Sequence, residues 1–260
     1  MAYDYERFKV EIKRITKIDL NAYKERQMKR RIDSLIEKNG YKGYEDFVSG
    51  LLKDTALLKT FVNYLTINVS EFYRNPAQWK ILEEDILPKI IEQAGPKLRI
   101  WSAACSTGDE PYTIAMILAK RMPLKDIHIV ATDLDEEVIR FAKNGVYSER
   151  SIAGLPNEYL VKYFQKTSSG MYQITDDIIR CVEFKKHNLL LDSYPTNMDL
   201  IVCRNVLIYF TEEAKNQIYR KFKASLNDYG VLFIGNTEQI IKAKEIGFES
   251  YKSFFYSKRQ

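Results

Sequence analysis

The residues best placed for chemistry are Asp109 and Glu110, two carboxylates that follow an apolar run and a short turn. The run Leu98–Trp101 predicts a strand, the small residues up to Gly108 predict a turn, and apolar residues at helical spacing continue from Tyr112. Junctions of this kind hold adenine-containing ligands in open α/β sheets. The segment is therefore a candidate nucleoside site.

The charges and the single glycine of this turn narrow the ligand class. A dinucleotide fingerprint has three glycines, so a pyrophosphate is not predicted. Carboxylates at a helix start repel phosphate and attract a cationic amine. S-adenosylmethionine is a nucleoside with that charge. The alternative is ordinary helix capping by Asp109, with Pro111 in the first helical turn.

A third carboxylate, Asp133, follows the predicted strand Ile127–Thr132. An acidic side chain at the tip of this strand can accept hydrogen bonds from both ribose hydroxyls of a nucleoside. The alternative is an N-cap for the helix that begins near Asp135. The two roles are compatible, since Asp135 can cap the helix while Asp133 binds the ribose.

Polar residues also follow two further strands. Arg204 and Asn205 come after Leu200–Cys203, and a helical turn there would place Asn205 and Tyr209 on one side. In the alternative, residues 206–210 only begin a buried helix. The stretch His187–Leu189 has a similar carboxyl-end position.

Arg74 lies between aromatic residues and an Asn-Pro pair, with Phe72 and Tyr73 directly before it. This pattern suggests a cation held against aromatic faces and directed at an anion. The alternative is a solvated arginine at a helix end.

The order of predicted elements indicates a helical region followed by an α/β region. Residues 5–93 show helical spacing without strand-like alternation, and Ala94-Gly-Pro96 ends the last helix. Strands and helices then alternate, which predicts a mostly parallel sheet. The other strand candidates are 231–235 and 251–257. Short β-like runs at 164–165, 171–175 and 180–185 predict an inserted antiparallel ribbon at about 164–187. We therefore expect a helical domain (1–75), a linker helix (76–96) and an α/β domain (97–260).

Composition fits a globular protein, with 45% hydrophobic and 29% charged residues. No run is long and apolar enough for a membrane span, and the sequence starts without a signal-peptide pattern. The cysteines at 105, 181 and 203 form no C-x-x-C pair, so reduced thiols and a cytoplasmic location are expected. The chain has two histidines, and no metal site is expected.

The segment Lys24–Arg31 carries five basic residues and one acidic residue. Helical spacing of Met28 and Ile32 leaves the cations outward, as a surface for an acidic partner. A solvated helix face is the alternative. The net charge is only +5, without a second basic stripe, so nucleic acid is not the expected partner. The candidate docking residues are Lys24, Arg26, Lys29, Arg30 and Arg31.

Together these stretches resemble the CheR-type methyltransferases of bacterial chemotaxis receptors. Five motifs carry the resemblance, in the family's order and over nearly the whole chain: Thr66-Ile-Asn-Val-Ser-Glu-Phe-Tyr-Arg74, Trp101-Ser-Ala-Ala-Cys-Ser-Thr-Gly-Asp-Glu-Pro-Tyr112, Ala131-Thr-Asp-Leu-Asp135, His187-Asn-Leu-Leu190 and Cys203-Arg-Asn-Val-Leu-Ile-Tyr-Phe210. Two departures are small: Ser70 stands where many members have Thr, and Asp109 where many have Glu.

The resemblance implies a class I, Rossmann-like methyltransferase domain with an N-terminal helical domain and a small β-subdomain. It implies methyl transfer from S-adenosylmethionine to receptor glutamates, which leaves S-adenosylhomocysteine, by a monomer that does not insert into the membrane. The implied cofactor contacts are Asn68, Ser70, Arg74, Glu110, Asp133, Asn188, Leu189, Asn205 and Val206. Arg74 and Tyr209 are the implied catalytic residues. The short Ser168-Ser169-Gly170 connection leaves it open whether the β-subdomain holds a receptor tail.

The chemistry of such a reaction is compatible with the residues present. A glutamate, with a pKa of ~4.3, is ionised at neutral pH, so the nucleophile needs no general base. Two alternatives stay open from the residues alone: an RNA or small-molecule methyltransferase on the same fold, and a non-catalytic adaptor that binds S-adenosylmethionine.

Overall fold

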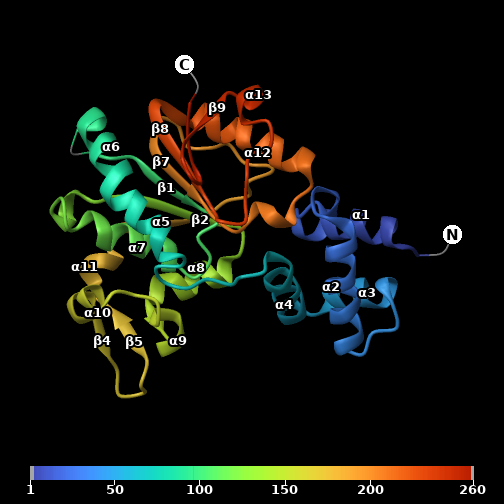
Figure 1. Ribbon diagram of the computed structural model, residues 1–260. Coiled ribbons are helices and arrows are strands. Elements are labelled where there is room, and N and C mark those ends of the chain that lie inside the picture. Colours follow the sequence, from blue (N-terminus) through green and yellow to red (C-terminus); the bar gives the residue numbers. More distant parts are fainter. Residues whose placement is uncertain (1–2, 96, 259–260) are drawn as a thin grey trace. The chain divides into compact units, whose positions relative to one another are not determined.

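The computed structural model describes residues 3–95 and 97–258, which form two compact units (Figure 1). The helical unit contains the chain up to Asn68 together with Tyr209–Asn216. The sheet unit contains Val69–Ile208 and the chain from Gln217 onward. None of the described helices is long and apolar enough to span a bilayer.

The helical unit confirms the helical pattern read from the sequence. Its elements up to residue 68 are α1 (Tyr5–Thr16), the 3₁₀ turn η1 (Leu20–Ala22), α2 (Glu25–Lys38), α3 (Tyr44–Lys53) and α4 (Thr55–Thr66). Asp54 starts α4 by accepting hydrogen bonds from two N–H groups of its first turn. Its core includes three fully buried rings, those of Phe8, Phe47 and Phe61. The ring centroids of Phe47 and Phe61 are 5.4 Å apart in an edge-to-face contact.

The sheet unit is built on one seven-stranded sheet, counted over the described residues, with the order β6-β2-β1-β7-β8-β10-β9. Its strands are β1 (Ile100–Ala103), β2 (Ile129–Asp133), β6 (Val182–Lys186), β7 (Met198–Cys203), β8 (Leu226–Ile234), β9 (Phe248–Lys252) and β10 (Phe255–Lys258). The first five are parallel, and β10 and β9 are added in antiparallel pairs. The mostly parallel sheet is as predicted.

Two details of the predicted strands are wrong. The single strand expected at 251–257 is a hairpin, β9–β10, with Phe254 at a positive φ of 69° in its turn. No Gly or Pro marks this turn in the sequence. The antiparallel ribbon is also shorter than expected, because β6 pairs in parallel with β2 and buries Val182 and Phe184 in the main sheet. The ribbon instead has the order β3-β5-β4, from β3 (Val146–Tyr147), β4 (Phe164–Lys166) and β5 (Tyr172–Ile174).

The remaining helices connect these strands. They are α5 (Pro76–Ile81), the π-helical turn η2 (Leu82–Ile86), α6 (Leu87–Ala94), α7 (Asp109–Leu118), η3 (Leu124–Asp126), α8 (Glu136–Asn144), α9 (Glu149–Ile152), α10 (Asn157–Tyr163), α11 (Asp176–Ile179), η4 (Leu207–Tyr209), α12 (Glu212–Ser225) and α13 (Ala243–Ile246). The segment predicted as a linker helix carries α5, η2 and α6. Its Trp79, Leu82 and Ile90 are buried in the core of the sheet unit.

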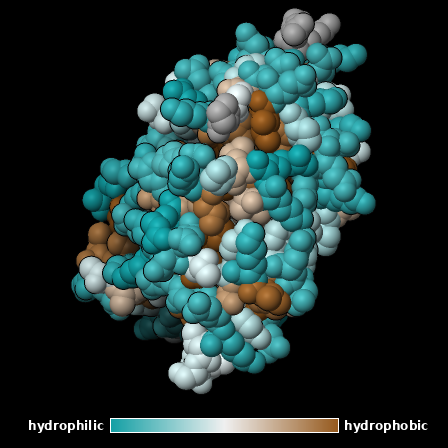
Figure 2. Space-filling model, turned by 90° about the vertical axis from the view of Figure 1, so that its left-hand side faces the viewer, coloured by the Kyte–Doolittle hydropathy of each residue, from teal (hydrophilic) through white to brown (hydrophobic). Residues whose placement is uncertain are grey.

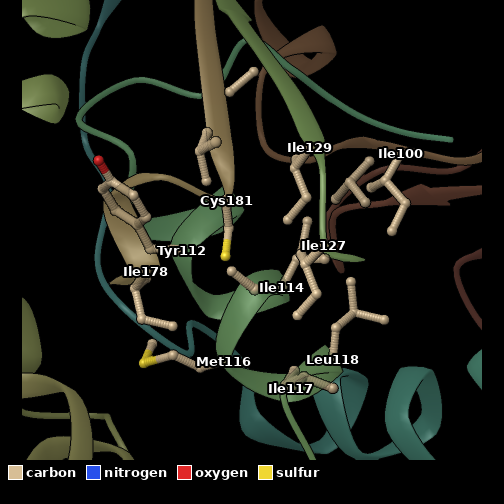
Figure 3. Packing of buried hydrophobic residues seen from close by; sticks show 14 of the residues in the cluster. Ile100, Tyr112, Ile114, Met116, Ile117, Leu118, Ile127, Ile129, Ile178 and Cys181 are labelled. Carbon is tan, nitrogen blue, oxygen red and sulfur yellow. The ribbon is translucent and has the colours of Figure 1, made fainter. Parts of the chain in front are cut away.

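The core beneath the candidate site packs α7 against the sheet (Figure 3). Ile100 and Ile129 come from neighbouring strands, while Ile114 and Ile117 come from α7. All residues of α7 from Pro111 to Leu118 are buried, as expected of a helix inside the core. Each such side chain contributes about 1.5–3 kcal/mol when fully buried. This packing positions the first turn of α7, which carries the two carboxylates.

The surface of one face is mostly hydrophilic, with hydrophobic side chains in small separate patches (Figure 2). Among the described residues, Val161 on α10 is one large apolar side chain that is exposed. Scattered exposure of this kind is normal for globular proteins and marks no particular site.

Candidate functional site

The strand order brings most of the predicted site residues of the sheet unit to one edge. β6, β2, β1 and β7 are neighbours and parallel, so the loops after their carboxyl ends lie side by side. The loops after β6 and β7 carry Asn188, Leu189, Asn205 and Val206, while Asp133 is the last residue of β2 and Glu110 lies in the first turn of α7, after β1. The chain order reverses between β1 and β7, which is where open α/β sheets bind their ligands.

The turn after β1 needs an unusual backbone. Ala104, Ser106 and Gly108 all have positive φ, at 63°, 49° and 88°. A Cβ on Gly108 would lie 2.9 Å from the Cβ of Ala142, so a side chain does not fit there. Strained backbone of this kind clusters at ligand-binding sites.

Asp109 occupies the first position of α7, and the N-cap is Gly108. The capping role considered for Asp109 is therefore wrong. Its buried carboxylate accepts a hydrogen bond of 2.5 Å from the Thr107 hydroxyl. Burial raises its pKa to about 6, and hydrogen bonds from Thr107 and Ser70 oppose that shift. Ser70, a predicted cofactor contact, thus lies beside the first turn of α7.

Glu110, in the first turn of α7, is paired with groups of two neighbouring strands. It accepts a hydrogen bond of 2.8 Å from the Ser102 hydroxyl, and its Oε2 lies 3.9 Å from Nη1 of Arg204. Burial raises its pKa to about 7, against the opposing effects of Arg204 and Ser102. The side chain keeps 13% exposure, so the carboxylate can still meet a ligand.

Asp133 ends β2 and is anchored by backbone N–H groups. Its oxygens accept from Ser106 N at 2.8 Å and from Asp135 N at 3.0 Å. Burial raises its pKa to about 6. The N-cap of α8 is Asp135, which accepts from Glu137 N at 2.9 Å. Asp135 therefore caps α8, and Asp133 lies at the end of β2 without a capping role.

The loop after β6 is fixed by local hydrogen bonds. Asn188 Oδ1 accepts from Leu190 N at 2.9 Å, and the Leu189 carbonyl accepts from the Tyr194 hydroxyl at 2.7 Å. His187 N donates to the Asp133 carbonyl at 2.8 Å. The carboxyl-end position expected for residues 187–189 is confirmed, directly beside Asp133.

The segment after β7 does not continue as a helix. Asn205 has a φ of 59°, in the left-handed region, and the short helix η4 begins only at Leu207. The expectation that one helical turn places Asn205 and Tyr209 on the same side is therefore wrong. A side chain that the sequence did not single out, Glu238, accepts from the N–H groups of Asn205 and the two residues after it. Its one sequence signal is its position three residues after Gly235, at the end of a strand.

The segment around Arg74 is held by Arg204. The Arg204 guanidinium donates to the Arg74 carbonyl at 2.8 Å and to Gln78 Oε1 at 2.7 Å. It lies 4.8 Å from the ring centroids of both Trp79 and Phe233. The cation that lies against aromatic faces here is thus Arg204, which follows β7. The partly exposed Arg74 instead donates to the Val69 carbonyl at 3.4 Å. In the sequence, Arg204 is recognisable only as a polar residue at a strand end.

The helical unit contains the other predicted residues. Asn68 donates to the Thr66 hydroxyl at 2.9 Å, and the Tyr209 carbonyl accepts from Lys24 N at 2.9 Å. Asn68 and Tyr209 are assigned to this unit, and the remaining predicted cofactor contacts to the sheet unit.

The basic residues of α2 divide into two groups. Lys24, Arg26 and Arg30 are exposed. Lys29 pairs with Asp33 at 3.0 Å, and Arg31 donates to the Tyr64 carbonyl at 2.7 Å while lying over the Tyr64 ring. Two of the five candidate docking residues therefore already have partners within their own unit.

Comparison with known proteins covers nearly the whole chain. The model of the CheR methyltransferase all-alpha domain matches residues 3–66, and that of the CheR methyltransferase SAM binding domain matches residues 68–254. The chemotaxis protein methyltransferase of Listeria innocua is 43% identical over 255 residues, which are 98% of this chain and 97% of the relative. Its counterpart in Listeria monocytogenes is 44% identical over the same shares of both chains. The chemotaxis protein methyltransferase 2 of Vibrio cholerae is 35% identical over 229 residues, covering 85% of this chain and 79% of the relative.

Proposed function

The chain belongs to the CheR methyltransferase family, and we propose that it methylates glutamate side chains of chemotaxis receptors. The cofactor of its 68–254 domain is S-adenosylmethionine. The products of the proposed reaction are glutamyl methyl esters and S-adenosylhomocysteine. Family membership supports methyl transfer, and the glutamate acceptor and the receptor partner are the proposed part.

The observation that carries the proposal is a pair of largely buried carboxylates on adjacent parallel strands: Glu110 in the first turn of α7, after β1, and Asp133 at the end of β2. Ionised carboxylates only accept hydrogen bonds, and S-adenosylmethionine offers donors in its ammonium group and its ribose hydroxyls. We assign Glu110 to the amino group and Asp133 to the ribose. Asn68, Ser70, Arg74, Asn188, Leu189, Asn205 and Val206 complete the proposed contacts.

The proposed reaction needs alignment more than acid–base catalysis. The cofactor supplies an activated methyl group on a sulfonium. The acceptor carboxylate is already ionised, and both charges disappear as the methyl is transferred, so exclusion of water assists the reaction. Alignment of the reacting groups contributes on the order of 7 kcal/mol or more. We assign Arg74 to orienting a carboxylate and Tyr209 to holding the acceptor oxygen through its hydroxyl.

The exposed cations of α2, Lys24, Arg26 and Arg30, support an acidic helix as the partner. Receptor segments rich in glutamate have that chemistry. We propose that this surface attracts the receptor, while Lys29 and Arg31 mainly stabilise the helical unit. We further propose that the enzyme acts as a monomer.

The decisive experiment incubates the full chain with methyl-labelled S-adenosylmethionine and a cytoplasmic chemoreceptor fragment. Release of labelled methanol from the receptor by alkali is expected, because glutamyl methyl esters are base-labile. A matched receptor with Gln or Ala at its acceptor glutamates is the control. Label that enters RNA, or no turnover to S-adenosylhomocysteine, would contradict the proposal.

A further inference from the structure

We propose that Glu238 is a positioning residue that sets the backbone of Asn205, Val206 and Leu207 and thereby the affinity for the cofactor. The inference rests on the proposed contact of Asn205 and Val206 with S-adenosylmethionine. Glu238 itself acts through the backbone of this loop.

Four backbone N–H groups converge on the Glu238 carboxylate. Oε2 accepts from Asn205 N and Gly235 N, both at 2.8 Å. Oε1 accepts from Leu207 N at 2.8 Å and from Val206 N at 3.2 Å. The side chain is buried, with 6% exposure. One carboxylate therefore satisfies three consecutive N–H groups after β7 and one at the end of β8.

This arrangement explains how the loop keeps an unfavourable backbone. Asn205 lies in the left-handed region, at a φ of 59°. Successive N–H groups that point to one place form a concavity that suits an anion. Here the anion is the side chain of Glu238 itself, and its hydrogen bonds hold the loop in its bent form.

The turn after β8 allows the Glu238 carboxylate to reach the backbone of Asn205. A Cβ on Gly235 would lie 2.8 Å from both Asn205 N and Glu238 Oε2, so only glycine permits this approach. Glu238 N closes the turn by donating to the Gly235 carbonyl at 3.0 Å. Thr237, inside the same turn, accepts from Asn205 Nδ2 at 3.4 Å. Gly235, Thr237 and Glu238 thus act together on Asn205.

Glu238→Gln tests the inference with little change in shape. The amide keeps one acceptor oxygen and places an NH₂ group against backbone donors, so at least one N–H group loses its partner. We expect the Kd for S-adenosylhomocysteine, measured by calorimetry on the full chain, to rise roughly tenfold or more. The KM for S-adenosylmethionine should rise in parallel, while the KM for receptor stays unchanged.

Asp199→Asn is the matched control. Asp199 is also a buried carboxylate, with 2% exposure, and accepts from Arg99 N at 2.7 Å and from Asn227 Nδ2 at 2.6 Å. It lies near the start of β7, whereas Asn205 follows the end of that strand. Asp199→Asn should lower the melting temperature without changing the cofactor affinity, which separates positioning from general stability.

The outcomes are distinct. Wild-type affinity in Glu238→Gln, or an equal loss of affinity in Asp199→Asn, overturns the inference. If Glu238→Gln does not fold, Glu238→Asp is measured in the same way. Its carboxylate is withdrawn by one methylene, so a Kd increase of roughly threefold or more is expected, and wild-type affinity again overturns the inference. A wild-type protein that binds S-adenosylhomocysteine but methylates no receptor glutamate would contradict the proposed function. The Kd values of the variants for S-adenosylhomocysteine would still test the role of Glu238.

Discussion

Arg204 and Glu110 join two loops of the sheet edge through opposite charges, with Nη1 and Oε2 3.9 Å apart. The two side chains are 3% and 13% exposed, so both charges are largely removed from water. Burial of a charge is costly unless hydrogen bonds compensate for it. Arg204 obtains them from the Arg74 carbonyl and Gln78, and Glu110 obtains one from Ser102. A single guanidinium therefore links the loop after β7, the first turn of α7 and the Arg74 segment.

Arg204→Lys should weaken both the fold and cofactor binding. An ammonium keeps the charge but cannot reproduce the planar, forked set of donors that reaches Arg74 and Gln78. We expect a loss of about 1–3 kcal/mol in the free energy of unfolding, measured in urea. The affinity for S-adenosylhomocysteine should fall as well. Arg180→Lys, at an exposed ion pair, is the control and should change neither quantity.

Cofactor binding should depend on pH through Glu110. Burial raises its pKa to about 7, so the carboxylate gains a proton as the pH falls through neutrality. The proposed contact with a cationic amine needs the ionised form. Calorimetry from pH 8 downward should therefore show weakening near pH 7, and Glu110→Gln should bind weakly without that dependence. A wild-type affinity that is constant across neutral pH would remove Glu110 from the amine site.

The raised pKa of Glu110 also affects the stability of the fold. Lower pH should weaken cofactor binding but increase the free energy of unfolding. A carboxylic acid whose folded pKa lies above its unfolded value favours folding when protonated. The contribution of Glu110 is thus most favourable below about pH 4.5, and is lost as the pH rises to about 7. Without ligand, Glu110→Gln should melt a few degrees above the wild type at pH 8, with little difference at pH 5. Glu183→Gln, on the surface of β6, is the control.

Asp133 and Asp135 should separate ribose binding from helix capping. Asp133→Asn should raise the Kd for S-adenosylhomocysteine by roughly 10–100-fold, since hydrogen bonds to a charged acceptor contribute about 1.5–3 kcal/mol. Asp135→Ala removes the N-cap of α8 and should cost about 0.5–2 kcal/mol of stability. Its cofactor affinity should stay at the wild-type value. Equal affinity in both variants would place the ribose elsewhere.

Charge reversal at the exposed arginines of α2 should change the KM for receptor and leave the KM for cofactor unchanged. Arg26→Glu with Arg30→Glu should raise the KM for receptor on the order of tenfold at low salt, and less as salt screens the charges. The KM for the cofactor should not change. Lys38→Glu, exposed at the end of α2, is the control within the same helix. Arg31→Glu should instead lower stability, because Arg31 holds the Tyr64 carbonyl.

Tyr209→Phe should lower kcat with little change in cofactor affinity, since only a hydroxyl proposed to orient the acceptor is lost. Arg74→Ala should reduce both turnover and cofactor affinity, because a charged contact is removed. Steady-state kinetics with receptor and calorimetry with S-adenosylhomocysteine distinguish the two patterns. Wild-type kcat in Tyr209→Phe would exclude its hydroxyl from the reaction.

Sequence patterns predicted the parallel strands and the placement of Glu110 and Asp133, because polar residues that follow apolar runs mark strand ends. They failed where the backbone is exceptional. The four-residue spacing of Asn205 and Tyr209 predicts one side only if a helical turn joins them, and the neighbours of Asn205 do not indicate its positive φ. The turn at Phe254, likewise, has no Gly or Pro. The proposed role of Glu238 could not be predicted from the sequence for a different reason. It depends on β7 and β8 being neighbours, which only the folded sheet reveals.

The path of the chain limits how this protein can be recombined with its relatives. Tyr209–Asn216 belongs to the helical unit, and α12 then continues into the sheet unit. Within the helical unit, the Phe210 ring stacks on Tyr23 at 4.6 Å, and Thr211 N donates to the Ala22 carbonyl. A chimera that exchanges only residues 1–68 would pair a foreign η1–α2 junction with a native Phe210. An exchange of the helical unit therefore has to include residues 209–216 as well as residues 1–68, which are encoded by two separate pieces of the gene. A gene that exchanges only one of them encodes a helical unit whose two parts do not match.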